Sequence, residues 1–137
     1  TTTSRHSLSS VISSRHLLEV AFLENGLLSN EKELHSNEFV LEEDTFARDA
    51  FILQNETIGR LELVNHLSNQ VKVRVSADVP AWGIWSTADK KAPFVCLEPW
   101  YGRCDKEDFE GELSEREYMQ SLESGEEFTG GYLMELL

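Results

Sequence analysis

The sequence predicts an all-β domain, an antiparallel β-sandwich, for a chain of 137 residues. Apolar and polar residues alternate with a period of two over residues 71–79, which indicates a half-buried strand. Several other short apolar runs are separated by turn-forming residues, and no long helices alternate with them. Hydrophobic residues make up 40% and charged residues 27% of the chain, a mixture typical of a domain with a core.

The N-terminal segment differs from the rest in composition. It is rich in Ser and Thr, lacks acidic residues and has no clear period, so residues 1–16 are predicted to be a tail or a foreign junction. A transit peptide has a similar composition, which leaves import into an organelle as an alternative. The folded part is predicted to span residues 17–137, and Asn25–Gly26 marks a tight turn near its start.

The clearest predicted element is an antiparallel hairpin. Leu61 and Leu63 alternate with charged residues, residues 66–70 contain turn formers, and the strand at 71–79 follows. Pro80 is expected to end that strand because it has no backbone donor. Further short strands are predicted over residues 51–54, 94–98 and 128–136.

Acidic residues dominate the charge of the chain. Twelve Lys and Arg stand against 25 Asp and Glu, so the formal net charge is −13. Such a chain repels nucleic-acid phosphates and anionic lipid, so neither nucleic acid nor membrane is expected as a partner. A neutral sugar would not be repelled, although acidity is also an ordinary route to solubility. Many of these residues lie in a predicted loop, 105–117, where Ser114 and Glu117 have the spacing of a helix-capping box.

The cysteines and the hydropathy bear on compartment and cofactors. Cys96 and Cys104 are too few for a disulfide framework, and no further Cys/His pairs suggest a metal site. No apolar stretch approaches the roughly 20 residues that span a bilayer, and no signal peptide opens the sequence. These features predict a cytoplasmic protein.

Residues 80–102 hold all three tryptophans and a candidate catalytic carboxylate. In an extended strand, Cys96 and Glu98 point to one side, and Pro99 is expected to end the pairing so that Glu98 stands at the rim of a sheet. Partial burial beside a Trp would disfavour the charged form of Glu98 and suit it to general-base chemistry. The alternative is a surface carboxylate at a strand end, with the tryptophans filling the core.

Several motifs resemble a known family. PFVCLEPWYG at 93–102 and SLESGEEFTGGYLMEL at 121–136 resemble the C-terminal signature of the galactose mutarotase-like proteins, especially the LacX-type branch of the aldose 1-epimerase family. FARDAFIL at 46–53, VKVRVSADVP at 71–80 and WGIWS at 82–86 occur in the same order as in that branch. The resemblance covers about residues 17–137 and identifies the chain as similar to the C-terminal part of such a protein.

This resemblance implies a β-sandwich with a sugar in its concave cleft and an isomerase that interconverts the α and β anomers of an aldose without a cofactor. A carboxylate takes the proton of the C1 hydroxyl, and a histidine protonates the ring oxygen. Glu98 matches the family's glutamate, and Asp49 lies near a hydroxyl-binding aspartate. Trp85 matches an aromatic cleft position and Trp100 belongs to the motif, so both are expected to bind the substrate. A turn or capping role for Asp49 and core packing for Trp85 remain alternatives.

The chain also departs from the family pattern. The acid histidine belongs to an N-terminal motif that is absent here, and none of the four histidines fits it: His6, His16, His35 and His66. A non-catalytic carbohydrate-binding or degenerate domain is therefore the alternative function. Half a sandwich would leave an apolar sheet face and open edges, so self-association is expected.

Overall fold

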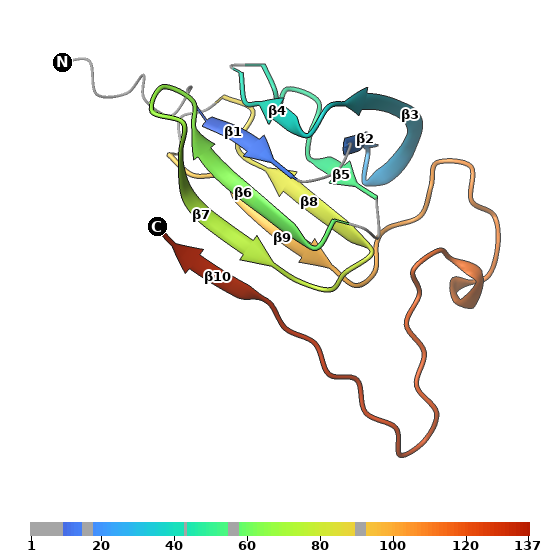
Figure 1. The fold of residues 1–137 in the computed structure, drawn as a ribbon. Coiled ribbons are helices and arrows are strands. Elements are labelled where there is room, and N and C mark those ends of the chain that lie inside the picture. The colour runs from blue at the N-terminus through green and yellow to red at the C-terminus, as the bar shows by residue number, and fades with distance from the viewer. Residues whose placement is uncertain (1–9, 15–17, 43, 55–57, 90–92) are drawn as a thin grey trace.

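The computed structural model describes residues 10–14, 18–42, 44–54, 58–89 and 93–137, and most of the predicted tail lies outside these ranges. Within them, ten strands form two antiparallel sheets that pack face to face (Figure 1). Sheet A has the order β10-β7-β6-β1-β4 and consists of β1 (Ser10–Ser13), β4 (Glu38–Val40), β6 (Arg60–Asn65), β7 (Gln70–Ser76) and β10 (Leu133–Leu136). Sheet B has the order β3-β2-β5-β8-β9 and consists of β2 (Leu18–Glu24), β3 (Leu27–His35), β5 (Phe51–Leu53), β8 (Ala81–Trp85) and β9 (Cys96–Trp100). The predicted fold class is confirmed.

The core lies between the two sheets. Alternate residues of each strand point inward, so that Ile12, Leu61 and Val75 of sheet A meet Val20 and the other inward residues of sheet B. Burying each large apolar side chain contributes about 1.5–3 kcal/mol. The largest fully buried side chain belongs to Trp82, whose indole Nε1 donates a hydrogen bond to the Ile58 carbonyl oxygen at 2.8 Å. Trp82 is thus a core residue with its polar atom satisfied.

Both predicted turns are found. Asn25 and Gly26 have φ of 53° and 79° and join β2 to β3, as expected for a two-residue turn of type I′. The hairpin of β6 and β7 is also confirmed, with the Asn65 side chain accepting the backbone N–H of Leu67 at 3.0 Å. β7 ends at Ser76, before the predicted limit, and the N–H of Ala77 makes one further bond toward the β6 side, to the Gly59 carbonyl at 3.0 Å.

Three elements differ from the prediction. Ser10–Ser13, within the predicted tail, forms β1 and pairs with both β4 and β6. The strand predicted over 128–136 is limited to Leu133–Leu136, and the one predicted over 94–98 is shifted to Cys96–Trp100. In the predicted acidic loop, the spacing of Ser114 and Glu117 does not form a capping box. The short 3-10 helix η2 (Leu113–Glu115) begins after Glu112, which makes no side-chain capping bond.

A helix long and apolar enough to cross a membrane is absent from the described part of the chain.

Candidate functional site

The candidate site lies on the face of sheet B that points away from the core, here called the outer face. In the β8–β9 pair, Gly83 is opposite Glu98 and Trp85 is opposite Cys96. Residues directly opposite each other share a face, and Ile84, which lies between Gly83 and Trp85 on β8, points into the core. Glu98 therefore projects from the outer face.

Glu98 is half-buried and has a defined partner. Its Oε2 accepts a hydrogen bond from the indole Nε1 of Trp100 at 3.0 Å. The prediction that Glu98 stands at a sheet rim beyond the pairing is wrong, because Pro99 continues β9 opposite Trp82. A proline is tolerated there because β9 is at the edge of sheet B in the described structure, where its missing N–H breaks no ladder.

Gly83 makes room for the Trp100 ring. A Cβ atom added to Gly83 would lie 2.6 Å from Cζ2 and 2.8 Å from Cε2 of Trp100, closer than real Cβ contacts. The indole thus lies against bare backbone of β8, and from there it reaches Glu98. Gly83 was not among the residues predicted from the sequence. A glycine inside the apolar run AWGIW was the available signal, since such a glycine often marks a close approach.

Trp85 is the diagonal neighbour of Glu98 across the β8–β9 pair. Its ring is half-buried and lies 5.8 Å from that of Phe94 between centroids, tilted by 48°. Phe94 is 46% exposed. Two aromatic side chains, Trp85 and Trp100, therefore share the outer face with the carboxylate, so the structure brings together three of the four predicted site residues.

Asp49 lies apart from Glu98 and Trp100. One residue, Ala50, separates it from the start of β5, and β8 lies between β5 and β9. Its Oδ1 accepts the N–H of Ala50 at 2.7 Å, as a local turn residue does. Its φ is 144°, in a region that residues other than glycine rarely adopt and that costs about 1–3 kcal/mol.

The chain after β9 covers part of the outer face. The Leu28 N–H of β3 donates to the Asp105 carbonyl at 2.8 Å, and the Glu107 N–H donates to the Leu28 carbonyl at 2.9 Å. Because β9 and β3 are at opposite edges of sheet B, residues 101–106, here called the crossing segment, pass over the sheet. Cys104 and the Trp100 ring pack there on a second apolar cluster: Ala21, Leu28 and Ile52.

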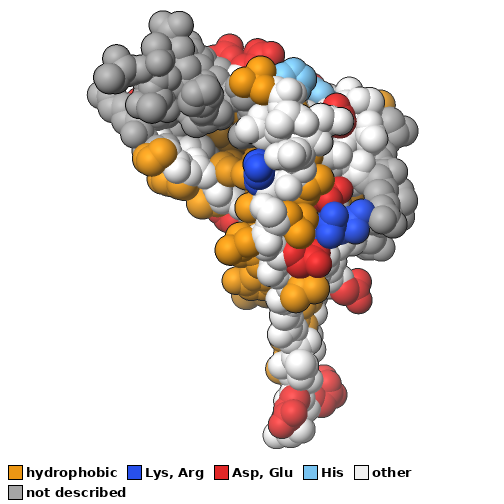
Figure 2. Space-filling model, turned by 60° about the vertical axis from the view of Figure 1, so that its left-hand side comes forward, with side chains coloured by type: hydrophobic (Ala, Val, Ile, Leu, Met, Phe, Trp, Pro, Cys, Tyr) orange, Lys and Arg blue, Asp and Glu red, His pale blue; other side chains and the backbone are white. Residues whose placement is uncertain are grey.

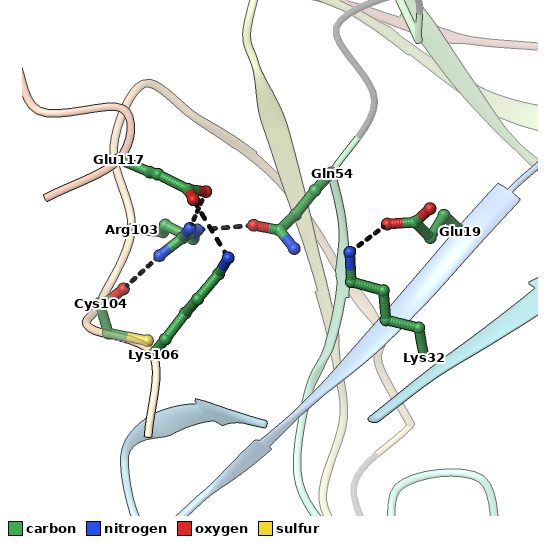
Figure 3. Close-up of polar contacts among 7 residues, drawn as sticks. All are labelled: Glu19, Lys32, Gln54, Arg103, Cys104, Lys106 and Glu117. Atoms are coloured by element: carbon green, nitrogen blue, oxygen red, sulfur yellow. Dashed lines mark hydrogen bonds and ion pairs between the residues drawn. The ribbon is translucent and has the colours of Figure 1, made fainter. Parts of the chain in front are cut away.

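Arg103 fixes the crossing segment to the sheet (Figure 3). Its side chain is 1% exposed. Its Nε donates to the Gln54 Oε1 at 2.6 Å, its Nη1 donates to the Cys104 carbonyl at 2.9 Å, and its Nη2 pairs with Glu117. Lys106 also binds Glu117, with Nζ 3.1 Å from Oε1. The Lys106 hydrogen bond, followed by the charges of Lys106 and Arg103, lowers the pKa of Glu117 against the opposing effect of burial.

Arg103 is a residue of this region that no sequence pattern predicted. An arginine so close to the EPWYG motif has no period or spacing that distinguishes it from a surface residue. Only the crossing of the segment over sheet B, a non-local feature, buries it.

A hollow follows the free edge of β9. It has a volume of about 370 Å³ and lies between β9 and the C-terminal segment, which the Tyr101 hydroxyl holds by accepting the Gly131 N–H at 2.9 Å. Glu98 and Trp100 line it together with Leu97, Pro99, Tyr101, Gly131, Tyr132 and Met134. Its volume falls in the range of small-molecule sites.

Neither described histidine is near Glu98. His35 ends β3 at the opposite edge of sheet B, with Nε2 3.2 Å from Glu33 Oε2 and its ring 4.8 Å from that of Phe39. His66 is exposed in the turn between β6 and β7. The other two histidines, His6 and His16, lie outside the described residues. Among the side chains that the structure describes, no group of three or more His, Cys, Asp or Glu is arranged to hold a metal ion.

Comparison with known proteins places this fold. No family model and no curated protein matches the chain. It is similar to the structure of a galactose mutarotase related enzyme from Lactobacillus acidophilus, with 27% identity and a TM-score of 0.84 over 100% of this chain and 48% of that chain. It is also similar to a galactose mutarotase-like protein from Lactobacillus casei ATCC 334, with 20% identity and a TM-score of 0.66 over 93% of this chain and 45% of that one. The chain thus has the galactose mutarotase-like fold and corresponds to about half of such a protein, which confirms the family resemblance of its sequence.

Proposed function

We propose that the chain is the base-bearing part of an aldose 1-epimerase, an isomerase that interconverts the α and β anomers of an aldose, and that Glu98 is its general base. The observation that carries the proposal is the position of Glu98 on the outer face of sheet B. There its carboxylate accepts the Trp100 indole hydrogen bond and lies diagonal to Trp85. The 27% sequence identity of the chain to a galactose mutarotase related enzyme is further support.

In the proposed reaction, one oxygen of Glu98 removes the proton from the C1 hydroxyl of the sugar. The electron pair of that O–H bond forms the C1 carbonyl, and the bond between C1 and the ring oxygen breaks. The ring oxygen takes a proton from a general acid, which gives the open-chain aldehyde. Rotation about the C1–C2 bond, followed by the reverse steps on the other face of the carbonyl, inverts C1. Protons and electrons balance without any cofactor.

Two other predicted residues, Trp85 and Asp49, have binding roles in this proposal. Trp85 offers a flat apolar ring to the C–H face of the sugar, and Asp49 binds a hydroxyl. The strained φ of Asp49 supports a functional role, because such backbone strain gathers at ligand-binding sites. The protein is proposed to work in the cytoplasm, where its two free thiols, Cys96 and Cys104, would stay reduced.

The general acid is expected from outside the described residues. His35 and His66 lie away from Glu98, and the chain spans 48% of the Lactobacillus acidophilus enzyme to which it is similar. The distance of both described histidines from Glu98 favours a second candidate function, a carbohydrate-binding domain that binds the sugar without converting it.

Polarimetry separates the two candidate functions. The optical rotation of freshly dissolved α-glucose and α-galactose is followed with the wild-type chain, Glu98→Gln and a control, Glu127→Gln, on the exposed C-terminal segment. A general base contributes about 10²–10⁴-fold, so Glu98→Gln is expected to abolish most of the acceleration while Glu127→Gln keeps it. Equal rates for wild type and Glu98→Gln contradict the base assignment. No acceleration by any variant, together with sugar-dependent Trp fluorescence, identifies the binding domain.

A further inference from the structure

We propose that Trp100 is a positioning residue for Glu98. Its indole N–H holds one carboxylate oxygen, and Gly83 provides the space that lets the ring take this place. The other oxygen is left to accept a proton or a hydrogen bond from a sugar hydroxyl. The catalytic part of this inference rests on the proposed function of Glu98 as the general base.

The strand geometry explains why the contact is specific. Glu98 and Trp100 are two residues apart on β9, so both side chains project from the outer face. The Nε1–Oε2 distance of 3.0 Å is normal for a hydrogen bond. A glutamate side chain in solution samples many rotamers, and a fixed donor reduces the freedom lost when a substrate binds.

The Trp100 ring is itself immobilised. One side lies against the backbone of Gly83, where a Cβ would come within 2.6 Å of Cζ2. The ring also packs against the apolar cluster of Ala21, Leu28 and Ile52 beneath the crossing segment. The donor therefore belongs to a rigid part of the sheet, as a positioning group should.

The chemistry of the donor suits a base. An indole N–H is a neutral donor that accepts nothing, so it orients the carboxylate without delivering a proton or a full positive charge. A Lys or Arg in this place would stabilise the carboxylate more strongly and reduce its basicity. This assignment gives Trp100 a role toward Glu98, and Trp85 is left as the aromatic wall for the sugar.

The contact can be tested by NMR without any turnover. The chain is labelled with ¹⁵N-tryptophan, and the Trp100 indole signal is assigned by its loss in Trp100→Phe. The Trp100 signal is expected to shift with pH as a carboxyl group titrates, and this shift should vanish in Glu98→Gln. The Trp82 signal is the internal control, because its partner is the Ile58 carbonyl. A Trp100 signal that does not move with pH, or that moves equally in Glu98→Gln, overturns the inference.

A pair of glycine variants tests the role of the space at Gly83. Gly83→Ala places a methyl group in the space that the Trp100 ring occupies, so it is expected to abolish the pH-dependent shift of the Trp100 indole signal. Gly59→Ala is the matched control, because an added Cβ there meets nothing within 4 Å, and it should keep the shift. A folded Gly83→Ala chain with an unchanged titrating signal contradicts the proposed role of Gly83. If this variant does not fold, the Trp100 and Glu98 variants still decide the contact.

Kinetics connect the contact to catalysis. Trp100→Phe keeps a ring and removes the N–H, so kcat is expected to fall about tenfold with KM changed less than about twofold. If the wild-type chain is active and Trp100→Phe has the same kcat, the positioning role of Trp100 is overturned, while the assignment of Glu98 as the general base stands. If the wild-type chain shows no turnover, only the proposed function is refuted. The NMR titration then decides whether the Trp100 indole holds the Glu98 carboxylate.

Discussion

Glu98 is set apart from the other acidic residues by what surrounds it on its own strand. Cys96 and Trp100 share its face of β9, and Gly83 lies opposite. Most carboxylates of this chain are solvent-exposed, whereas Glu98 is half-buried, with one oxygen bound to an indole. Its role is thus argued from three neighbours, each of which can be changed separately.

Cys96 offers a chemical probe of the charge on Glu98. Burial, and next the negative charge of Glu98, raise the pKa of the Cys96 thiol. The thiolate is the reactive form, so Cys96 should react with iodoacetamide at pH 8 more slowly than a free cysteine does. Glu98→Gln removes the repulsive charge and is expected to speed the reaction at Cys96. Mass spectrometry of the modified peptides measures each cysteine separately, and an identical Cys96 rate in both chains would show that the two groups do not interact.

The sequence was a good guide to individual residues where one local rule decided the outcome. The period-two alternation placed Cys96 and Glu98 on one face, and the Asn25–Gly26 pair gave its turn because glycine and asparagine tolerate positive φ. Gly83 and Arg103 were missed for a different reason. Their roles depend on which segment crosses the outer face of sheet B, and the local sequence does not carry that information.

At the scale of elements, the crossing segment is the part that shapes the site. It leaves β9, passes over sheet B and pairs with β3 at Leu28. Arg103 is the buried tie between this segment, the Gln54 side chain after β5 and the acidic loop (Figure 3). A segment of mostly half-buried residues is therefore anchored by a side chain that is almost fully buried.

Loss of Arg103 is expected to loosen this element. Arg103→Ala leaves Gln54 Oε1 and the Cys104 carbonyl without this donor and leaves Glu117 with Lys106 alone, and we expect a loss of about 2–3 kcal/mol of unfolding free energy. Arg103→Lys keeps the charge but not the planar fork, so it should recover only part of that loss. Urea unfolding followed by Trp fluorescence measures both variants. A stability for Arg103→Ala equal to that of wild type contradicts the anchoring role.

The same anchor predicts a pH dependence. The pKa of Glu117 is lowered in the folded chain, first by its hydrogen bond to Lys106 and then by charge interactions with Lys106 and Arg103. A lowered folded pKa stabilises the fold above the unfolded pKa, about 4.5, and this contribution is lost as pH falls through the folded value. The melting temperature of wild type should thus exceed that of Glu117→Gln at pH 6, and the gap should narrow toward pH 3. A gap that is constant with pH would exclude Glu117 as its source.

Prediction of elements succeeded for the hairpin of β6 and β7 and failed for β1. The hairpin carries alternation and turn residues over a long stretch. β1 has only Val11 and Ile12 between serines, too few residues for a period, and it exists because β4 and β6 pair with it on both sides. Pro99 was wrongly predicted to end its strand. An edge strand tolerates proline, but the edge position of β9 is a tertiary property that the local sequence does not reveal.

At the scale of the whole molecule, the C-terminal segment connects the two sheets. The chain leaves sheet B at β9, runs outward as a long arm and returns as β10 alongside β7 of sheet A (Figure 1). The pairing of Leu133–Leu136 with β7 is reinforced by Arg74, which lies 3.0 Å from Glu62 and 3.3 Å from Glu135. One side of the sandwich is thereby bounded by two edge strands of the described structure, β9 and β10.

That side exposes apolar surface. In β10 and just after it, Leu133, Met134, Leu136 and Leu137 are 59%, 52%, 78% and 59% exposed. Figure 2 shows hydrophobic side chains open to solvent across the middle of the molecule, above a projecting segment with acidic side chains at its tip. An unpaired edge with apolar side chains is a template for pairing with another chain.

Self-association of this chain is therefore expected, and β10 is the element through which we expect it. Met134→Lys/Leu136→Lys places charges on the edge strand, whereas Leu67→Lys changes a leucine of similar exposure in the β6–β7 turn. Light scattering after size exclusion should give a mass above 15.6 kDa for wild type that grows with concentration. The double variant should stay near the monomer mass, and Leu67→Lys should behave as wild type. A wild-type chain that remains a 15.6 kDa monomer at every concentration contradicts this expectation, and equal association of the double variant moves the interface away from β10.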